Sequence, residues 1–536
     1  FYDELYALIY LIPHYGSFKD INTLMIRNYN DEKYKRKFAE IYSGALILDF
    51  QLIISPFDKS EDVSKLTKRV DQVNENLKSM TTSQINDFMK EKSITLSLAS
   101  KWVPSCNKKD SMIRTDIISH LWPLLDCSKK RNLKLGDMAL RKILTVLRQC
   151  CKVKEQNMTD SDISRTWKDI LPEEVPSKAV TKYSKAFLNL TRDGKTRSEN
   201  QDRINCAENF KKAIQDFKIK GAQSDLKNLA DIIWDDIINN KKSQIEKDLI
   251  DVQFKKMIQN VKNLVLEKYN SDIKEATENN LDVTSIKDPR CVIPVIDVSG
   301  SMFHAKVGHY AICLGIVCSS ISKIPGKIIT FSTKPEIIDF DLNANIFDTF
   351  RFLKDIDWAG STNIDATYGL VLDIMRKEKE LGNSLINDLS ILYLTDGQFD
   401  SLVVTEHSER FDIYVETKTL SLDKFDTFLD RKRSAFESSD FKLPMTIFWN
   451  LNTGLTHGFP AQSFTEGVKL VAGLSQTIMV EVMTGLLTQE KDNIDETSAS
   501  AAVTPLESFF KTLSDKSFDP VDEGLKMFVI SSSDED

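Results

Sequence analysis

Short apolar runs rich in β-branched residues recur in the second half of the chain and alternate with stretches of helical periodicity. The runs are 291–298, 327–331, 389–394 and 446–449, and the helical stretches are 305–323, 364–381, 422–436 and 475–487. A strand that is apolar on both sides is typical of a parallel sheet with helices on both faces. The alternation therefore predicts a doubly wound, Rossmann-like α/β domain over residues 289–490.

The first half of the chain carries apolar residues at three-to-four spacing, which is typical of helices. Leu140, Ile143, Leu144 and Leu147 illustrate this spacing. We therefore expect residues 1–288 to form an all-helical domain, and a solenoid, a closed ring and an open arc all fit the pattern. Residues 491–536 are strongly acidic and are predicted to form a solvated C-terminal segment.

Charge and cysteine content limit the classes of function. The net charge is 71 − 79 = −8, which excludes a chain that coats nucleic acid through an overall positive charge. The eight cysteines include no C-x-x-C pair, so a zinc ribbon is not expected and reduced thiols are. No apolar run approaches the roughly 20 residues that span a bilayer. We expect a protein of the cytoplasm or nucleus, or of a virion if it is viral, without membrane insertion.

Three polar segments are expected to meet at one edge of the predicted sheet. Asp297, Ser299 and Ser301 follow the first apolar run, Thr362 precedes the helical stretch 364–381, and Asp396 follows the third apolar run. The carboxyl ends of parallel strands form one rim, where ligands bind at the reversal of strand order. Two carboxylates and three hydroxyls form a hard-oxygen set suited to Mg²⁺ or Mn²⁺. We therefore predict a metal site at these five residues.

The same residues indicate binding rather than catalysis. A metal with few charged ligands stays electrophilic and can accept a carboxylate from a protein partner in its open position. Neither Ser299 nor Ser301 has a base that the sequence reveals, and no G-x-S-x-G motif is present. We predict no catalytic residues and no enzymatic activity. The alternative that these side chains only cap turns stays open at this point.

The order Asp-x-Ser-x-Ser, then Thr, then Asp resembles the von Willebrand factor A domain with its metal-ion-dependent adhesion site. The match is complete at Asp297, Ser299, Ser301, Thr362 and Asp396. The resemblance implies a Rossmann-like fold, a bound Mg²⁺ and a protein partner that donates a carboxylate to the metal. Our first functional hypothesis is therefore a non-enzymatic interaction or scaffold protein.

A helical front half joined to such a domain is similar to the TROVE-type proteins of the Ro, telomerase and vault group. It is more similar to an uncharacterised family of eukaryotes and large DNA viruses. The most distinctive matching segments are 358–362, 398–400 and 448–451. Many members have Ser-Asp-Met where this chain has Thr395-Asp396-Gly397, but the aspartate is retained.

This second resemblance implies two alternative functions. In Ro-type proteins the helices form a ring that binds RNA, so RNA binding by the helical domain is the second hypothesis. The viral members of the uncharacterised family motivate the third, a structural component of a viral particle or another large assembly.

A basic stretch supplies candidate nucleic-acid contacts. Residues 101–155 hold 13 Lys and Arg against 5 Asp and Glu, inside a chain of net charge −8. A tryptophan in this stretch could stack on a base of single-stranded or structured RNA. The alternative is a solvated helix face with a tryptophan in the core. The candidates are Lys101, Trp102, Lys108, Lys109, Lys129, Lys130, Arg131, Lys134, Arg141, Lys142 and Arg148.

Overall fold

A computed structural model describes most of the chain, and its described residues fall into two compact units, 18–167 and 168–483. The described ranges are 18–27, 31–56, 66–78, 80, 82–104, 111–121, 133–151, 167–280, 283, 286, 288–304, 306–332, 334–356, 362–382, 389–396, 402–408, 413–419, 425–452, 467–474 and 476–483.

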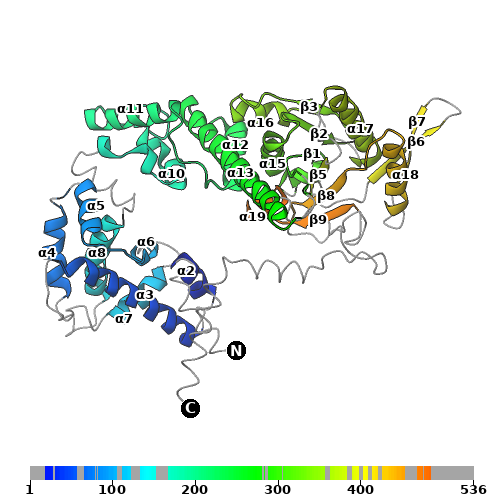
Figure 1. Cartoon of the computed structure of the whole chain (residues 1–536). Coiled ribbons are helices and arrows are strands. Elements are labelled where there is room, and N and C mark those ends of the chain that lie inside the picture. The colour runs from blue at the N-terminus through cyan, green and yellow to red at the C-terminus, as the bar shows by residue number, and fades with distance from the viewer. Residues whose placement is uncertain are drawn as a thin grey trace, which may run out of the picture. The chain divides into compact units, whose positions relative to one another are not determined.

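The N-terminal unit is helical, as the sequence predicts (Figure 1). The apolar sides of its helices pack together into one core. Tyr42, Phe50 and Leu140 are fully buried in this core. The predicted periodic residues of the last helix, Ile143 and Leu147 among them, lie in this core. The helices are α2 Phe18–Arg27, α3 Glu32–Ile54, α4 Leu66–Lys78, α5 Thr82–Glu91, α6 Ala99–Trp102, α7 Ser111–Leu121 and α8 Leu133–Cys150.

The second unit begins with further helices before its sheet. Their starts carry hydrogen-bonding caps: Asn200 and Asp225 each accept a backbone N–H, and Ser243 forms a capping box with Glu246. These caps fix where the polar loops end and the long helices begin. The elements are the 3₁₀ turns η2 Trp167–Asp169 and η3 Pro172–Glu174, and the helices α10 Ser177–Phe187, α11 Gln201–Gln215, α12 Leu226–Asn239 and α13 Gln244–Glu278.

A six-stranded sheet forms the centre of the second unit. Its order is β3-β2-β1-β5-β8-β9, and all neighbours are parallel except β2 and β3. Numbered along the chain, this is the 3-2-1-4-5-6 order of doubly wound folds, and the order reverses between β1 and β5. The sheet confirms the predicted strands and adds β3 and β9. The strands are β1 Val292–Asp297, β2 Lys327–Phe331, β3 Ile337–Asp339, β5 Ser390–Thr395, β8 Met445–Asn450 and β9 Val468–Ala472.

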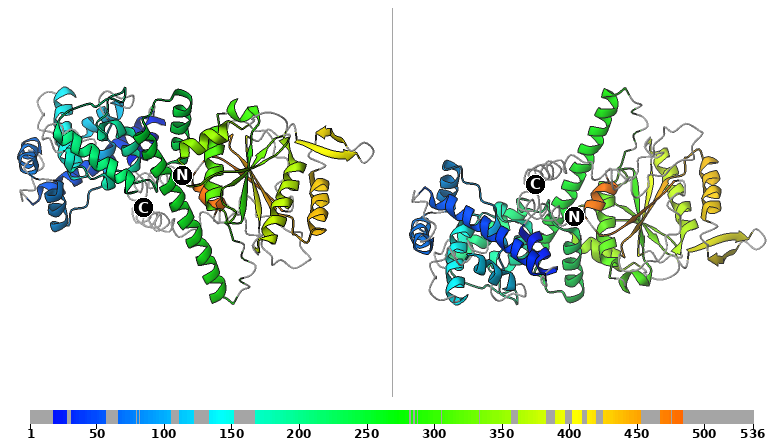
Figure 2. Two further views of the ribbon diagram at one scale, coloured as in Figure 1. Left: turned by 90° about the horizontal axis from the view of Figure 1, so that it is seen from above. Right: turned by 90° about the horizontal axis from the view of Figure 1, so that it is seen from below.

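Helices cover both faces of this sheet (Figure 2). One face packs against α15 Gly308–Ile321, and the other packs against α17 Ile364–Glu380 and α18 Phe425–Glu437. Helix α14 Gly300–His304 follows β1, α16 Ile346–Lys354 follows β3, and α19 Gln476–Met483 follows β9.

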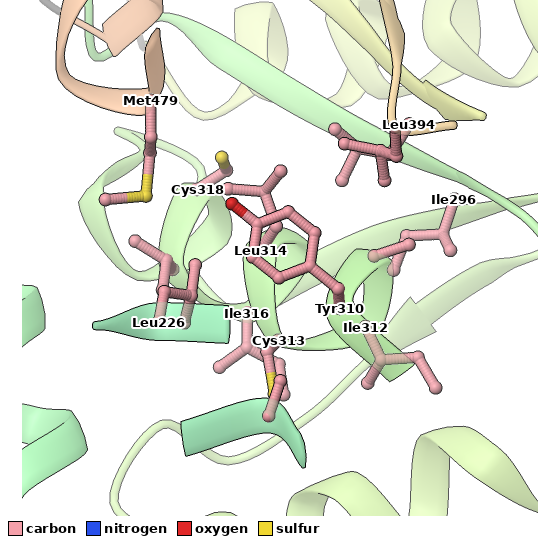
Figure 3. Packing of buried hydrophobic residues seen from close by; sticks show 14 of the residues in the cluster. Leu226, Ile296, Tyr310, Ile312, Cys313, Leu314, Ile316, Cys318, Leu394 and Met479 are labelled. Carbon is pink, nitrogen blue, oxygen red and sulfur yellow. The ribbon is translucent and has the colours of Figure 1, made fainter. Parts of the chain in front are cut away.

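Helix α15 is buried nearly all round. Figure 3 shows its Tyr310, Leu314 and Cys318 among side chains from four other elements. Ile296 and Leu394 reach it from the sheet, Leu226 from α12 and Met479 from α19. The helical segment before the sheet therefore shares the core of the sheet domain.

Because of this shared core, the boundary between the two compact units differs from the boundary expected from the sequence. The change from helices to sheet lies near the expected residue 288, but the compact division of the chain falls between Trp167 and Lys168. The physical reason is that the apolar sides of α12 and α13 are buried on the sheet domain. Polar contacts also join these helices to the sheet domain. Oδ1 of Asp251 in α13 accepts the backbone N–H of Ile346 in α16 at 2.8 Å, and Oδ1 of Asp231 in α12 lies 2.7 Å from Nε2 of His309 in α15.

A second, small sheet was not foreseen from the sequence. It has the order β4-β6-β7 and consists of β4 Thr362–Asn363, β6 Leu402–Ser408 and β7 Ile413–Thr419.

Within the described residues, no helix has both the length and the apolar character needed to cross a membrane.

Candidate metal centre

Two predicted carboxylates leave the sheet side by side. Asp297 ends β1, and Asp396 comes directly after β5. The two strands are parallel neighbours with Ile296 level with Leu394, so both aspartates lie at the carboxyl edge where the strand order reverses. Their exposed fractions are 1% and 0%. The fold therefore buries two acidic groups at the place where doubly wound proteins bind ligands.

The loop after β1 adds two hydroxyls. The backbone N–H of Ser299 donates to Oδ1 of Asp297 at 2.9 Å, which turns the chain back over the carboxylate. The Oγ atoms of Ser299 and Ser301 lie 2.8 Å apart. Both serines are half-buried, and Gly300 between them is exposed. The hydroxyls thus form the outer layer of the site and the carboxylates the inner layer.

The backbone of Thr362 lies at the same edge of the sheet. Thr362 is paired with Leu402, six residues after Asp396, and the N–H of Asn363 donates to the carbonyl of Ser332 just after β2. The side chain of Thr362 lies outside what the structure describes. Pairing of β4 with β6 therefore ties the threonine segment to the segment that follows Asp396.

Thr395 belongs to this centre, although the sequence analysis did not select it. Its hydroxyl donates to Oδ2 of Asp297 at 2.9 Å, and the residue is fully buried. Each oxygen of Asp297 therefore accepts a hydrogen bond, one from Ser299 and one from Thr395. The sequence signal that could have found it is a polar residue directly after the apolar run 391–394 and directly before Asp396.

The electrostatics of Asp297 suit a bound cation. Burial raises the pKa of Asp297 to about 6, the hydrogen bonds from Ser299 and Thr395 lower the pKa, and the nearby Asp396 raises it. Buried carboxylates of this kind need a compensating cation or a proton. The largest influences on its pKa are burial, Ser299, Thr395 and Asp396.

The donor set decides which cation fits. In the part of the chain that the structure describes, no three His, Cys, Asp or Glu side chains gather as a metal site. A cation here would therefore depend on hydroxyl and water oxygens besides the two carboxylates. This chemistry suits Mg²⁺ or Mn²⁺, which keep several waters, and it does not suit a thiolate-bound metal.

Replacement of Thr395 should weaken the metal site. In Thr395→Val, Oδ2 of Asp297 loses its donor and the carboxylate is no longer held on both sides. We expect Mn²⁺ affinity to fall about tenfold or more, the usual effect of losing a residue that orients a ligand. Isothermal titration calorimetry with Mn²⁺ measures this, and Thr395→Ser, which keeps the hydroxyl, should bind like the wild type. Equal affinity of the valine variant would contradict the assignment.

The candidate nucleic-acid residues that the structure describes lie on two helices. Lys101 and Trp102 lie on α6, and α8 carries Lys134, Arg141, Lys142 and Arg148. The remaining candidates, Lys108, Lys109, Lys129, Lys130 and Arg131, lie outside the described residues.

Several of the described cations in this stretch have internal partners. Arg141 pairs with Asp137 at 2.7 Å, and Lys142 pairs with Asp71 at 2.8 Å. Arg148 donates to the carbonyls of Ser100 and Val103, both at 2.8 Å, and so ends the short helix α6. The structure thus gives three of these cations a role in the fold, and RNA binding by the stretch stays a prediction.

Comparisons with known proteins point to uncharacterised relatives. A family model described as a domain of unknown function, DUF7788, matches residues 291–522, which include the sheet and both aspartates. "Uncharacterized protein L728" of Acanthamoeba polyphaga mimivirus is 26% identical over 438 residues, 80% of this chain. The chain spans 63% of the length of that relative. The expected similarity to a protein of a large DNA virus is therefore confirmed.

A solved structure also appears among the similar proteins. It is the Ro (RSR) protein of Deinococcus radiodurans, with 9% identity and a TM-score of 0.26, over 89% of this chain and 93% of that one. A score this low carries no argument about shared fold or function. The von Willebrand A assignment and the bound metal accordingly stay predictions.

Proposed function

We propose that this protein binds a divalent cation at the carboxyl edge of its sheet and uses the cation to hold a carboxylate of a protein partner, as von Willebrand factor A domains do. The supporting observation is the burial of Asp297 and Asp396 together at the reversal of strand order, beneath two hydroxyls. No general base or nucleophile is assigned, and the role is binding without catalysis.

Each residue of the centre has a distinct part in this function. Asp297 and Asp396 supply the negative charge that attracts Mg²⁺, and Thr395 orients Asp297. Ser299 and Ser301 supply neutral oxygens on the solvent side, where a partner can approach. A bound Mg²⁺ would offer an electrophilic position for an incoming carboxylate. The exposed Gly300 leaves space for this approach, because among the described residues no atom beyond its chain neighbours and its own helix backbone lies within 4 Å of the point where a Cβ would be.

The test separates metal binding from partner binding. Calorimetry with Mn²⁺ should show one tight equivalent for the wild type and a loss of at least about tenfold for Asp297→Asn and Asp396→Asn. Asp348→Asn, on the exposed side of α16, removes the same charge and should leave the affinity for Mn²⁺ unchanged. A labelled peptide with a single glutamate should then bind in Mg²⁺ but not in EDTA, and its glutamine version should not bind.

Either of two results would overturn the proposal. The first is Mn²⁺ binding that survives both aspartate substitutions, and the second is peptide binding that EDTA leaves unchanged. A role in a viral particle remains the third prediction of the sequence, and the description of the mimivirus relative contains nothing that favours it.

A further inference from the structure

Asn450 is a buried polar residue at the carboxyl edge of the sheet, on the strand next to the one that leads to Asp396. It is the last residue of β8, it is 6% exposed, and it follows the fully buried Phe448 and Trp449. Strand β8 is the parallel neighbour of β5, and Asn450 is level with Thr395. A buried amide in this position calls for an explanation, because burial of a polar group costs free energy unless its hydrogen bonds are replaced.

Asn450 continues a row of polar residues across three strands. Ile296 of β1 is level with Leu394 of β5. The residues that follow them, Asp297 and Thr395, are therefore also level, and the hydrogen bond from the Thr395 hydroxyl to Asp297 joins them. Residues that are level on parallel strands share one face of the sheet. Because neighbouring strands are about 4.8 Å apart, Asn450 lies roughly 5 Å from Thr395 and roughly 10 Å from Asp297, measured between Cα atoms.

Hydrogen bonds fix the backbone around Asn450 on both sides. The N–H of Leu451 donates to the carbonyl of Thr395 at 2.8 Å, and the N–H of Gly473 donates to the carbonyl of Asn450 at 3.0 Å. The indole N–H of Trp449 donates to the carbonyl of Gly473 at 2.8 Å. Gly473 has a φ of +125°, in the left-handed region that favours glycine. The ends of β5, β8 and β9 therefore hold Asn450 in place before any ligand binds.

The two polar atoms of the Asn450 side chain have different roles. Its Oδ1 accepts the backbone N–H of Asn452 at 2.8 Å. Only the oxygen of an amide accepts a hydrogen bond, so this contact also identifies which atom is Nδ2. In the part of the chain that the structure describes, Nδ2 donates to no acceptor. The fold thus orients the amide through its oxygen and leaves two N–H donors for a ligand.

The chemistry of this donor suits the neighbourhood of a bound cation. A lysine or arginine beside the metal centre would repel the cation, and an acid would repel an incoming carboxylate. A neutral amide does neither, and its N–H groups can donate to a carboxylate or carbonyl oxygen. A cation held by Asp297 and Asp396 would bind any accessible carboxylate, whereas a fixed N–H donor nearby favours a segment with an oxygen in the matching place.

We propose that Nδ2 of Asn450 donates a hydrogen bond to an oxygen of the partner segment whose carboxylate binds the metal. This inference rests on the proposed function, because it concerns the same partner. Asn450 is then a specificity-determining residue that contacts the partner and leaves the metal ligands alone.

The experiment compares partner binding with metal binding in the full chain. Fluorescence anisotropy measures the labelled single-glutamate peptide in Mg²⁺, and calorimetry measures Mn²⁺ alone. Asn450→Asp keeps an oxygen that accepts the N–H of Asn452 and replaces the donor with a negatively charged oxygen. Asn450→Ala removes the donor without adding charge. The matched control is Asn200→Asp at the start of α11, where Oδ1 also accepts a backbone N–H two residues on, at 3.1 Å from Asp202. Circular dichroism checks that each variant is folded.

We expect the Kd for the peptide to rise at least about tenfold in Asn450→Asp and about threefold or more in Asn450→Ala. Mn²⁺ should bind Asn450→Asp at least as tightly as the wild type, because the added negative charge attracts the cation. The control should match the wild type in both measurements.

The two measurements separate failure of this inference from failure of the proposed function. Normal Mn²⁺ binding with unchanged peptide affinity in both Asn450 variants would overturn the inference alone. An equal loss of peptide affinity in Asn200→Asp, or a parallel loss of Mn²⁺ affinity in Asn450→Asp, would also overturn it. If the wild type binds no Mn²⁺, or binds no peptide in Mg²⁺, the proposed function fails and this inference fails with it.

Discussion

A fragment of residues 289–490 will not fold stably, whereas a fragment of residues 168–490 will. The shorter fragment lacks α12 and α13, whose Leu229, Ile233 and Met257 are buried with α15 in one core. Each such side chain contributes about 1.5–3 kcal/mol when it is buried. The two helices place eight large apolar side chains in this core, so their loss removes about 12–24 kcal/mol, against the 5–15 kcal/mol of net stability that a typical domain has. Thermal unfolding followed by circular dichroism, together with gel filtration, compares the two fragments.

Single substitutions in the longer fragment provide the matched control. Ile233→Ala removes a fully buried side chain of α12 and should cost about 2–5 kcal/mol. Ile238→Ala, on the same helix, removes a side chain that is 58% exposed and should cost less than about 0.5 kcal/mol. Cooperative unfolding of residues 289–490 at the melting temperature of the longer fragment would show that the helices are not part of the core.

Removal of the charge on Asp297 will stabilise the protein when no divalent cation is present. The pKa of Asp297 is about 6 in the folded protein and near 3.8 when unfolded. The folded state therefore holds this proton more tightly, so the stability that Asp297 contributes is fully present below pH 4 and is lost as pH rises through about 6. The difference amounts to at most about 3 kcal/mol. Asp297→Asn should remove this fall, and Thr395 can accept from its amide instead of donating.

Urea unfolding in EDTA at pH 4, 5, 6 and 7 measures this effect. Mg²⁺ at pH 7 should stabilise the wild type and leave Asp297→Asn unchanged. Asp288 is a control of opposite sign, because Arg290 and Lys323 pair with it at 2.7 Å and its pKa lies near 2. Asp288→Asn should destabilise the protein at pH 7 by about 3 kcal/mol. The interpretation fails if the stability of the wild type does not change from pH 4 to pH 7.

The central strands and the serine loop could be predicted because their signals are local. β1, β5 and β8 are apolar on both sides, which only a doubly covered sheet explains, and Asp297, Ser299 and Ser301 lie within five residues. The placement of Asp396 beside Asp297 could be predicted because the carboxyl ends of parallel strands lie at one edge of a sheet. The edge strand β3 and the two-residue β4 were missed, because so few residues do not show a period.

The sequence by itself determined the doubly wound sheet, the helical first half and the carboxyl edge that holds the two aspartates. Only the tertiary structure decided that α12 and α13 belong to the core of the sheet domain, because burial depends on which surface an apolar helix meets. It also decided that Thr395 orients Asp297, and that Arg148 ends α6 while Arg141 and Lys142 pair with acids. The sequence alone does not show which lysines and arginines are paired. Their electrostatic role depends on which acids the fold brings within 4 Å.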